Sequence, residues 1–281
     1  MKEYVLTDKQ LQAFGRHLLR EECSPGTIDK YLRDTRAFFR WLEGRPVTRE
    51  AAACWKAYLV EAGYAPVTVN SMLSALNRLF LFLGWSGCRV KFLKIQRRLF
   101  RDSSRELTRR EYDRLLSSAQ AMGRERLSLI METVCATGIR VSEVRYITVQ
   151  AARIGRAEIA LKGKVRVILL PAKLCRKLLK YAGGEKLSSG PIFRTGSGRE
   201  IGRRQIWWEL KGLCARAGVE PSKVFPHNLR HLFATVFYRA FKDIARLADV
   251  LGHSSIETTR IYLVTSGKEH QRQLEQLVLV S

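Results

Sequence analysis

The sequence lacks the features that mark several classes of protein. No run approaches the roughly 18–20 uninterrupted apolar residues of a membrane-spanning helix, and the first residues lack the apolar segment of a secretory signal. The six cysteines stand 31 or more residues apart without a C-x-x-C pair. There is no G-x-x-x-x-G-K-[ST] loop and no carboxylate cluster suited to Mg²⁺. We therefore expect no membrane protein, disulfide scaffold, zinc finger, nucleoside triphosphatase or two-metal nuclease.

Acidic residues are also scarce. The chain has 26 Asp+Glu against 50 Lys+Arg, a formal charge of +24, while its 46% of apolar residues is ordinary for a folded globular protein. Arginines, whose planar fork binds phosphate bidentately, outnumber lysines by 34 to 16. Because such excess charge repels itself unless an anionic partner neutralises it, nucleic acid is the first candidate partner. We expect a cytoplasmic, nucleoid-associated protein that needs no cofactor and no metal.

The first part of the chain has a helical pattern. Apolar periodicity runs over residues 6–85, with breaks at 24–27, 43–48 and 63–68, and predicts four helices. The turns S-P-G-T and A-P-V-T lie 41 residues apart, and three apolar positions match at the same offset. The two helices that follow these turns are therefore predicted to be structural counterparts.

Polar residues on these two helices are candidate DNA contacts. Arg33, Arg36 and Arg40 fall on one face of the first helix, and Asn70 lies on the polar face of the second, with Arg78 nearby. A solvated helix surface would show the same pattern. In a chain this basic, the arginine stripe also suits a surface that faces DNA.

The helical pattern lapses near residue 95 in a basic stretch. We expect a linker at 96–105 between a domain at 1–95 and a second domain at 106–281. Residues 1–105 hold 19 basic and 10 acidic residues, a net +9, which leaves +15 for the rest. Two basic domains on a short tether suggest a clamp around the polyanion.

The second domain is predicted to combine helices with a small sheet. Three β-type runs occupy 145–149, 157–161 and 165–170, and Lys162-Gly163-Lys164 joins the last two as a hairpin. Helical patterns return from about 172 to 280. The predicted fold class is mainly α with a small three-stranded antiparallel sheet.

Residues that bind phosphate and move protons gather in three motifs of the second domain. The motifs A-T-G-I-R-V-S-E-V, P-H-N-L-R-H and L-G-H-S-S-I-E-T-T-R-I-Y supply Arg140, Glu143, His227, Arg230, His231, His253 and Tyr262. Two arginines can neutralise the non-bridging oxygens of a five-coordinate phosphate without a metal. Tyrosine can attack the phosphorus, and lysine or histidine can protonate the leaving oxygen.

Each of these residues also has an ordinary structural interpretation. A lone arginine is usually a surface ion-pair partner, His253 could help to cap a turn, and Tyr262 could be a buried aromatic. His227 and His231 stand at i and i+4, as two zinc ligands would. The segment lacks the glutamate of H-E-x-x-H and places an arginine between the histidines, which disfavours a metal.

Taken together, the three motifs resemble those of the tyrosine recombinase (phage integrase) family, most closely its Xer-like and transposon-integrase members. The resemblance covers nearly the whole chain. It implies a four-helix, SAM-like core-binding domain at the amino terminus, followed by a catalytic domain. It also implies that Tyr262 attacks the scissile phosphate to form a 3′-phosphotyrosyl link, with neither metal nor ATP. The other catalytic positions that it implies are Arg140, His227, Arg230 and His253.

The hairpin lysine corresponds less directly to the family pattern. The family shows a turn like G-K-G-x-K, whereas this chain reads L-K-G-K, shorter by one residue. We expect Lys162 to be the general acid because it immediately precedes the turn glycine, with Lys164 as the alternative. Glu143 matches a supporting position, and His231 is expected to support the site by hydrogen bonding.

The resemblance also implies partners. We expect double-stranded DNA and a homotetramer on two paired sites, in which the carboxy-terminal tail at about 266–281 docks into a neighbouring subunit; packing of the tail on its own domain is the alternative. The sequence leaves open the target DNA sequence and any need for accessory DNA-binding proteins. It also leaves open whether the biological task is integration and excision, inversion or dimer resolution. Two other functions are weighed: a catalytically silent DNA-binding regulator and a type IB topoisomerase-like enzyme.

Overall fold

The computed structural model describes residues 3–95, 103–161, 164–253 and 255–262. The chain divides into two compact units, Met1–Arg97 and Arg98–Ser281, and each is described by itself. The linker expected at 96–105 lies outside the described residues up to residue 102, and Ser103–Arg105 form a short 3-10 helix, η2. No helix of the described residues is long and apolar enough to cross a membrane.

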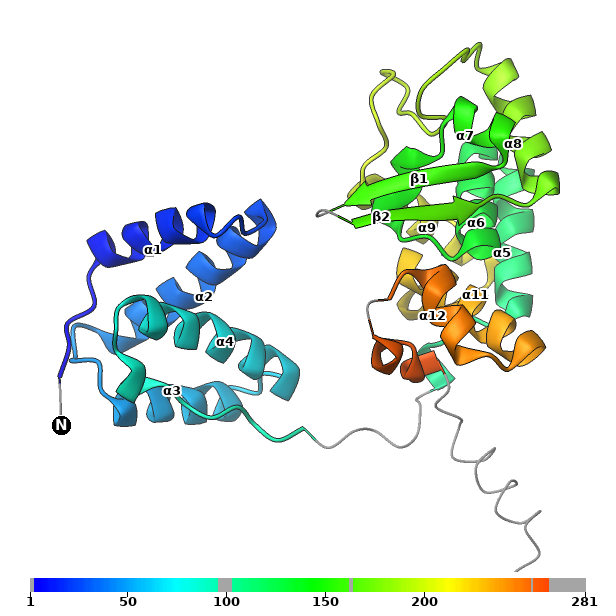
Figure 1. Cartoon of the computed structure of the whole chain (residues 1–281). Coiled ribbons are helices and arrows are strands. Elements are labelled where there is room, and N and C mark those ends of the chain that lie inside the picture. Colours follow the sequence, from blue (N-terminus) through cyan, green and yellow to red (C-terminus); the bar gives the residue numbers. More distant parts are fainter. Residues whose placement is uncertain (1–2, 96–102, 162–163, 254, 263–281) are drawn as a thin grey trace, which may run out of the picture. The chain divides into compact units, whose positions relative to one another are not determined.

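The first unit is a set of helices, as the periodicity predicted (Figure 1). Serine or threonine residues begin three of the helices by accepting a main-chain N–H bond, and proline stands at the first turn of α2 and α4. The four expected helices are confirmed. They are α1 (Asp8–Arg20), α2 (Pro25–Leu42), α3 (Arg49–Glu61) and α4 (Pro66–Phe82), followed by the 3-10 helix η1 (Ser86–Cys88).

Aromatic side chains fill the core of the first unit. Phe38 of α2 contacts Trp55 of α3 edge-on at a centroid distance of 5.1 Å, and Phe80 of α4 at 6.0 Å. All three side chains are at most 1% exposed. The two helices predicted to be counterparts, α2 and α4, therefore pack against each other through this core.

Two asparagines of α4 hold the segment that follows it. The Asn77 amide donates to the Val90 carbonyl and accepts from the Val90 N–H, and Asn70 makes the same pair of bonds with Leu93. The side of α4 that the pattern marked as polar is therefore covered by the chain's own backbone. Asn77 is 8% exposed.

The second unit contains helices and one hairpin (Figure 1). Its core surrounds α6, whose residues are buried on more than one face. In chain order after η2, the elements are α5 (Arg109–Ala121), α6 (Glu125–Thr137), η3 (Val141–Tyr146), α7 (Val149–Ile154), β1 (Arg156–Leu161), β2 (Lys164–Leu169), α8 (Ala172–Gly184), α9 (Arg203–Lys211), α10 (Cys214–Ala217), η4 (Pro221–Lys223), α11 (Pro226–Phe241), α12 (Ile244–Leu251), η5 (Ile256–Thr258) and η6 (Arg260–Tyr262).

The expected third strand is wrong. Residues 145–149 end the 3-10 helix η3 and begin α7, so the sheet of the described residues has two antiparallel strands, β1 and β2. Thr148 explains the difference, because its hydroxyl accepts the N–H of Ala151 at 3.0 Å and starts a helix. Its main-chain carbonyl accepts the Ala152 N–H of α7, and its strand-like pairing is an isolated antiparallel bridge with Pro191.

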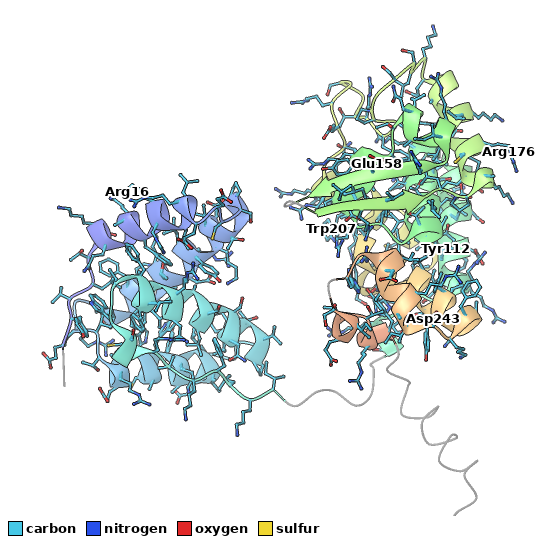
Figure 2. The ribbon with its side chains drawn as sticks, viewed as in Figure 1. Arg16, Tyr112, Glu158, Arg176, Trp207 and Asp243 are labelled. Carbon is cyan, nitrogen blue, oxygen red and sulfur yellow. The ribbon has the colours of Figure 1, made fainter. Side chains whose placement is uncertain are left out.

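The last described elements of the second unit pack near the end of α6, where the first of the three motifs begins. Helix α11 packs against α6, α12 and η6. Figure 2 labels Asp243 at the turn between α11 and α12, where its carboxylate accepts the Arg246 N–H at 2.9 Å. This cap fixes the direction of α12, whose end carries the L-G-H motif.

Candidate active site

Gly138 ends α6 in a left-handed conformation, with φ of 65°. A Cβ at this position would lie 2.4 Å from the ring of Phe233 in α11, so only glycine allows the two helices to approach this closely. The Gly138 carbonyl, turned out from the helix end, accepts a bond from Arg230 Nη1 at 2.6 Å. The first two motifs are therefore joined at this residue.

Glu143 organises the chain that follows. Its side chain is 2% exposed and accepts the Arg140 main-chain N–H at 2.7 Å and Arg140 Nη1 at 3.0 Å. The carboxylate also binds Arg166 Nη2 at 2.9 Å. Arg140 Nη2 also donates to the Gly252 carbonyl at 3.4 Å, and the side chain stays 45% exposed, so the guanidinium is held in place but remains accessible to an anion.

Arg230 lies at the centre of the cluster and is 2% exposed. Besides Gly138, its guanidinium donates to the Leu251 carbonyl at 2.8 Å and contacts His253 Nε2 at 2.9 Å. Burial, together with the charge of Arg140, lowers the pKa of Arg230 to about 10, and Tyr262 counteracts part of this fall. The group is still charged at neutral pH, and its terminal nitrogens are held by protein acceptors.

His253 has one defined tautomer in this arrangement. A guanidinium has no acceptor, so Nε2 accepts from Arg230, and the ring proton on Nδ1 points to Thr259 Oγ1 at 2.9 Å. Burial and the neighbouring arginines lower the pKa of His253 to about 4. The ring is therefore neutral at pH 7.

Tyr262 closes the cluster from η6. Its side chain is 5% exposed, with the ring edge-on to His231 at 4.7 Å and stacked on His253 at 6.2 Å. It packs in the small core that Ala234, Leu247 and Leu251 form. The tyrosine is thus held among the basic side chains by both α11 and α12.

The remaining predicted residues of this site fall into two groups. His227 is exposed at the start of α11, with its ring 6.2 Å from that of His231. Lys162 lies outside the described residues, and Lys164 begins β2 with a side chain that is also outside them. The choice between the two lysines therefore stays a prediction.

Reasoning from the sequence missed several residues of this cluster. Arg166 reaches it from β2, Thr259 binds His253, and the carbonyls of Gly138 and Leu251 bind arginine. Main-chain acceptors leave no mark in a sequence. The alternation of VRVIL does contain a usable signal, because Arg166 occupies an inward position of the strand.

The residues predicted to face DNA in the first unit have different surroundings. Arg33, Arg36 and Arg40 line one hollow of about 550 Å³ on the helix surface, and Arg33 also binds the buried Asp34 at 3.1 Å. Arg78 pairs with Glu21 at 3.4 Å. Both polar atoms of the Asn70 amide bind the main chain of residue 93.

Sequence comparison places this geometry in a family. Residues 105–269 match the phage integrase family, and residues 11–87 match the phage integrase N-terminal SAM-like domain. The chain belongs to the phage integrase family. This match confirms the resemblance seen in the three motifs and the type of the amino-terminal domain. The chain is a site-specific tyrosine recombinase, an enzyme that breaks and rejoins DNA.

Named relatives of this recombinase cover nearly its whole length. It is 31% identical to tyrosine recombinase XerC of Roseiflexus castenholzii, over 91% of this chain and 88% of that protein. It is also 31% identical to tyrosine recombinase XerA of Thermococcus kodakarensis, over 95% of this chain and 94% of that protein.

Solved structures share the fold of this recombinase. XerH site-specific recombinase bound to its difH substrate matches with a TM-score of 0.67 and 20% identity, over 95% of this chain and 84% of that chain. A lambda integrase tetramer bound to a Holliday junction matches with a TM-score of 0.73 and 18% identity, over 93% and 78%.

Proposed function

We propose that Tyr262 is the nucleophile of this recombinase and that Arg140 and Arg230 bind the scissile phosphate. The observation that supports this most directly is the convergence of the three motifs. Side chains up to 122 positions apart in sequence, from Arg140 to Tyr262, surround one small region of the second unit. Two guanidinium groups beside a tyrosine are what a metal-free phosphoryl transfer requires.

The proposed reaction has two balanced steps. The Tyr262 oxygen attacks the phosphorus and forms the 3′-phosphotyrosyl bond as the bond from phosphorus to the 5′ oxygen breaks. The phenolic proton passes to His227, which returns it to Tyr262 in the second step. Lys162, or alternatively Lys164, protonates the leaving 5′ oxygen. A 5′-hydroxyl of the partner strand then attacks the phosphotyrosine and releases Tyr262. Because the covalent link retains the bond energy, the reaction needs neither ATP nor a metal.

The supporting residues keep the basic groups in place. Glu143 holds Arg140, and His253 binds Arg230 through Nε2. His231 packs against the Tyr262 ring, and the exposed His227 lies next along α11. We assign His253 and His227 to contacts with the scissile phosphate, the attacking Tyr262 oxygen and the leaving 5′ oxygen. We assign His231 to holding the Tyr262 ring in place.

Duplex DNA is the proposed partner of both units. The hollow lined by Arg33, Arg36 and Arg40 presents three cations on one helix face of the first unit. Contacts of this kind bind phosphates without reading bases, so affinity should fall steeply as salt rises. Asn70 and Arg78 stay proposed contacts, and the Asn70 amide also binds the main chain of residue 93.

The proposed assembly is a homotetramer on two paired recombination sites. Support comes from the lambda integrase structure, which is a tetramer bound to a Holliday junction. The tail at 266–281, which we propose to dock into a neighbouring subunit, lies outside the described residues. The reaction is proposed to occur on DNA of the cytoplasm, in integration and excision, inversion or dimer resolution.

A nicked suicide substrate tests the nucleophile. Cleavage near the nick releases a short fragment, which traps the covalent protein–DNA adduct for a denaturing gel. Wild-type protein should give a shifted band, and Tyr262→Phe should bind DNA but give none. Tyr238→Phe is the matched control, because Tyr238 packs in the same small core from α11.

The outcomes separate the candidate functions. An undiminished adduct from Tyr262→Phe would refute the assignment of the nucleophile. A wild-type protein that binds DNA but forms no adduct under any condition would favour the silent regulator. Relaxation of supercoiled DNA without strand exchange between sites would favour the topoisomerase-like activity.

A further inference from the structure

Arg166 occupies an unusual place in the hairpin. In β2 the alternate residues Val165, Val167 and Leu169 are 51–76% exposed, whereas Ile168 on the other face is buried. Arg166 shares that inner face and lies opposite Ile159 in the register of the two strands. An inward position between buried aliphatic residues would ordinarily take another aliphatic side chain. Packing alone therefore does not explain why an arginine occupies this inward position.

Its contacts are specific. Nη2 pairs with the Glu143 carboxylate at 2.9 Å, with the two side chains 16% and 2% exposed. Nη1 donates to the Leu251 carbonyl at the end of α12. Burial lowers the pKa of Arg166, and the Glu143 charge opposes this fall. A buried cation that is paired in this way keeps its charge and a fixed orientation.

The next residue of the L-G-H motif makes room for this side chain. Gly252 has φ of +62°, and a Cβ there would lie 2.3 Å from both Cδ and Nη1 of Arg166. The turn and the strand are thus fitted to each other. Any larger residue at 252 would push the Arg166 side chain away from α12.

Arg166 shares an acceptor with each of the two arginines that are proposed to bind phosphate. Glu143 accepts from both Arg166 and Arg140, and the Leu251 carbonyl accepts from both Arg166 and Arg230. Both terminal nitrogens of Arg166 are therefore engaged with protein acceptors. Arg166 is thereby linked to both of these guanidinium groups.

We propose that Arg166 is a positioning residue, which ties the hairpin to Glu143 and Leu251 and thereby fixes the orientation of Arg140 and Arg230 toward the scissile phosphate. The inference rests on the proposed function of those two arginines. It adds a residue of the hairpin to the three motifs. The strand β2 and the two proposed phosphate-binding arginines would then be held by one continuous set of contacts.

The first test compares Arg166→Met with Arg156→Met. Both variants remove one positive charge from the hairpin, and Arg156 is exposed in β1. Single-turnover cleavage of the nicked substrate at saturating protein should be about 10–100-fold slower for Arg166→Met, the usual effect of losing an outer partner of a binding group. DNA affinity should change equally in both variants. Equal cleavage rates for the two variants would overturn the inference.

A second measurement separates positioning from general loss of structure. A scissile methylphosphonate lacks one negatively charged oxygen, so its cleavage depends less on correctly oriented arginines. The loss for Arg166→Met should be clearly smaller on this substrate, because the charge that the oriented arginines would stabilise is absent. A merely structural defect would slow both substrates to the same extent, and that result would contradict the inference.

A third comparison tests whether Arg166 acts through its contact with Glu143. Glu143→Gln and Arg166→Met should lower the cleavage rate by less in combination than the product of their single effects, because they break the same contact. Multiplicative losses would contradict action through this contact. Wild-type adduct formation is measured in parallel, so failure of the proposed function is seen separately from failure of this inference.

Discussion

At the scale of single residues, the candidate active site holds several positively charged side chains close together. Arg140, Arg166 and Arg230 repel one another, and the Glu143 carboxylate supplies only one negative charge. The carbonyls of Gly138 and Leu251 lie at the ends of α6 and α12, where the helix dipole is negative. These carbonyls stabilise the positive charge of the cluster.

Arg140 is the most exposed of the three, so its removal tests phosphate binding with little effect on the fold. Arg140→Ala should lower the single-turnover cleavage rate by about 10²–10³, the usual effect of removing one charge donor in a transition state. The matched control is Arg145→Ala in the 3-10 helix η3, which begins directly after Arg140; the Arg145 guanidinium binds Tyr146. A cleavage rate for Arg140→Ala within twofold of the Arg145→Ala rate would count against the assignment.

The His253 ring provides a prediction about pH. Burial and the arginines lower its pKa to about 4, below the value of about 6.5 expected in an unfolded chain. The unfolded state then binds more protons between these values, so the contribution of His253 to stability is complete above about pH 6.5 and is lost as pH falls toward 4. Nitrogen NMR of the ring, assigned with His253→Gln, should show one neutral tautomer at pH 6. A ring that titrates at pH 6.5 or above would contradict this picture.

At the scale of elements, glycines set how closely the helix ends approach the cluster. Gly138→Ala combines an unfavourable left-handed conformation with a clash against Phe233. We expect a loss of about 2–4 kcal/mol in the free energy of unfolding, from backbone strain and overpacking. Gly123→Ala is the control, since Gly123 also has a positive φ of 64° but has nothing within 4 Å of its Cβ position.

Urea unfolding of both variants measures the difference. Because the backbone conformations match, the extra loss in Gly138→Ala reports the contacts of the new methyl group with Phe233 of α11 and Leu251 of α12. Gly138→Ala should also cleave more slowly, since a shifted α11 moves Arg230 away from the Gly138 carbonyl. Equal stabilities for the two variants would show that Phe233 moves aside at no cost.

Elements also show where reasoning from sequence succeeds. The four helices of the first unit were predictable because their starts carry local signals, such as Ser24 followed by proline. A strand was wrongly predicted at residues 145–149 from their β-type composition. The prediction did not consider that the hydroxyl of Thr148 could cap a helix. A local signal was present in both cases, and the capping residue was the better guide.

At the scale of the site, the motif residues were predictable and their partners were not. Tyr262, Arg230 and His253 belong to motifs that a sequence displays directly. The position of Arg166 depends on the strand register, and the acceptor carbonyls depend on where α6 and α12 end. The backbone partners of Asn70 were not predictable either, because nothing in the sequence shows that residue 93 returns to the polar face of α4.

At the scale of the whole molecule, the excess positive charge has two uses. Most of the net charge of +24 belongs to surface residues. These residues occur in both units, and each unit would use them to bind the phosphates of the DNA backbone. A small part is buried at Arg230 and Arg166, where it is matched to acceptors instead of being exposed to solvent. Affinity and chemistry are therefore expected to respond to different substitutions.

The most direct test of the account is to identify the residue that bears the DNA. The trapped adduct is treated with nuclease and trypsin, and the nucleotide-bearing peptide is sequenced by mass spectrometry. Cleavage after Arg260 and Lys268 gives the peptide 261–268, whose one tyrosine is Tyr262. The account predicts a 3′-phosphate-linked nucleotide on that tyrosine. A nucleotide on any other residue, or on the 5′ side of the break, would contradict it.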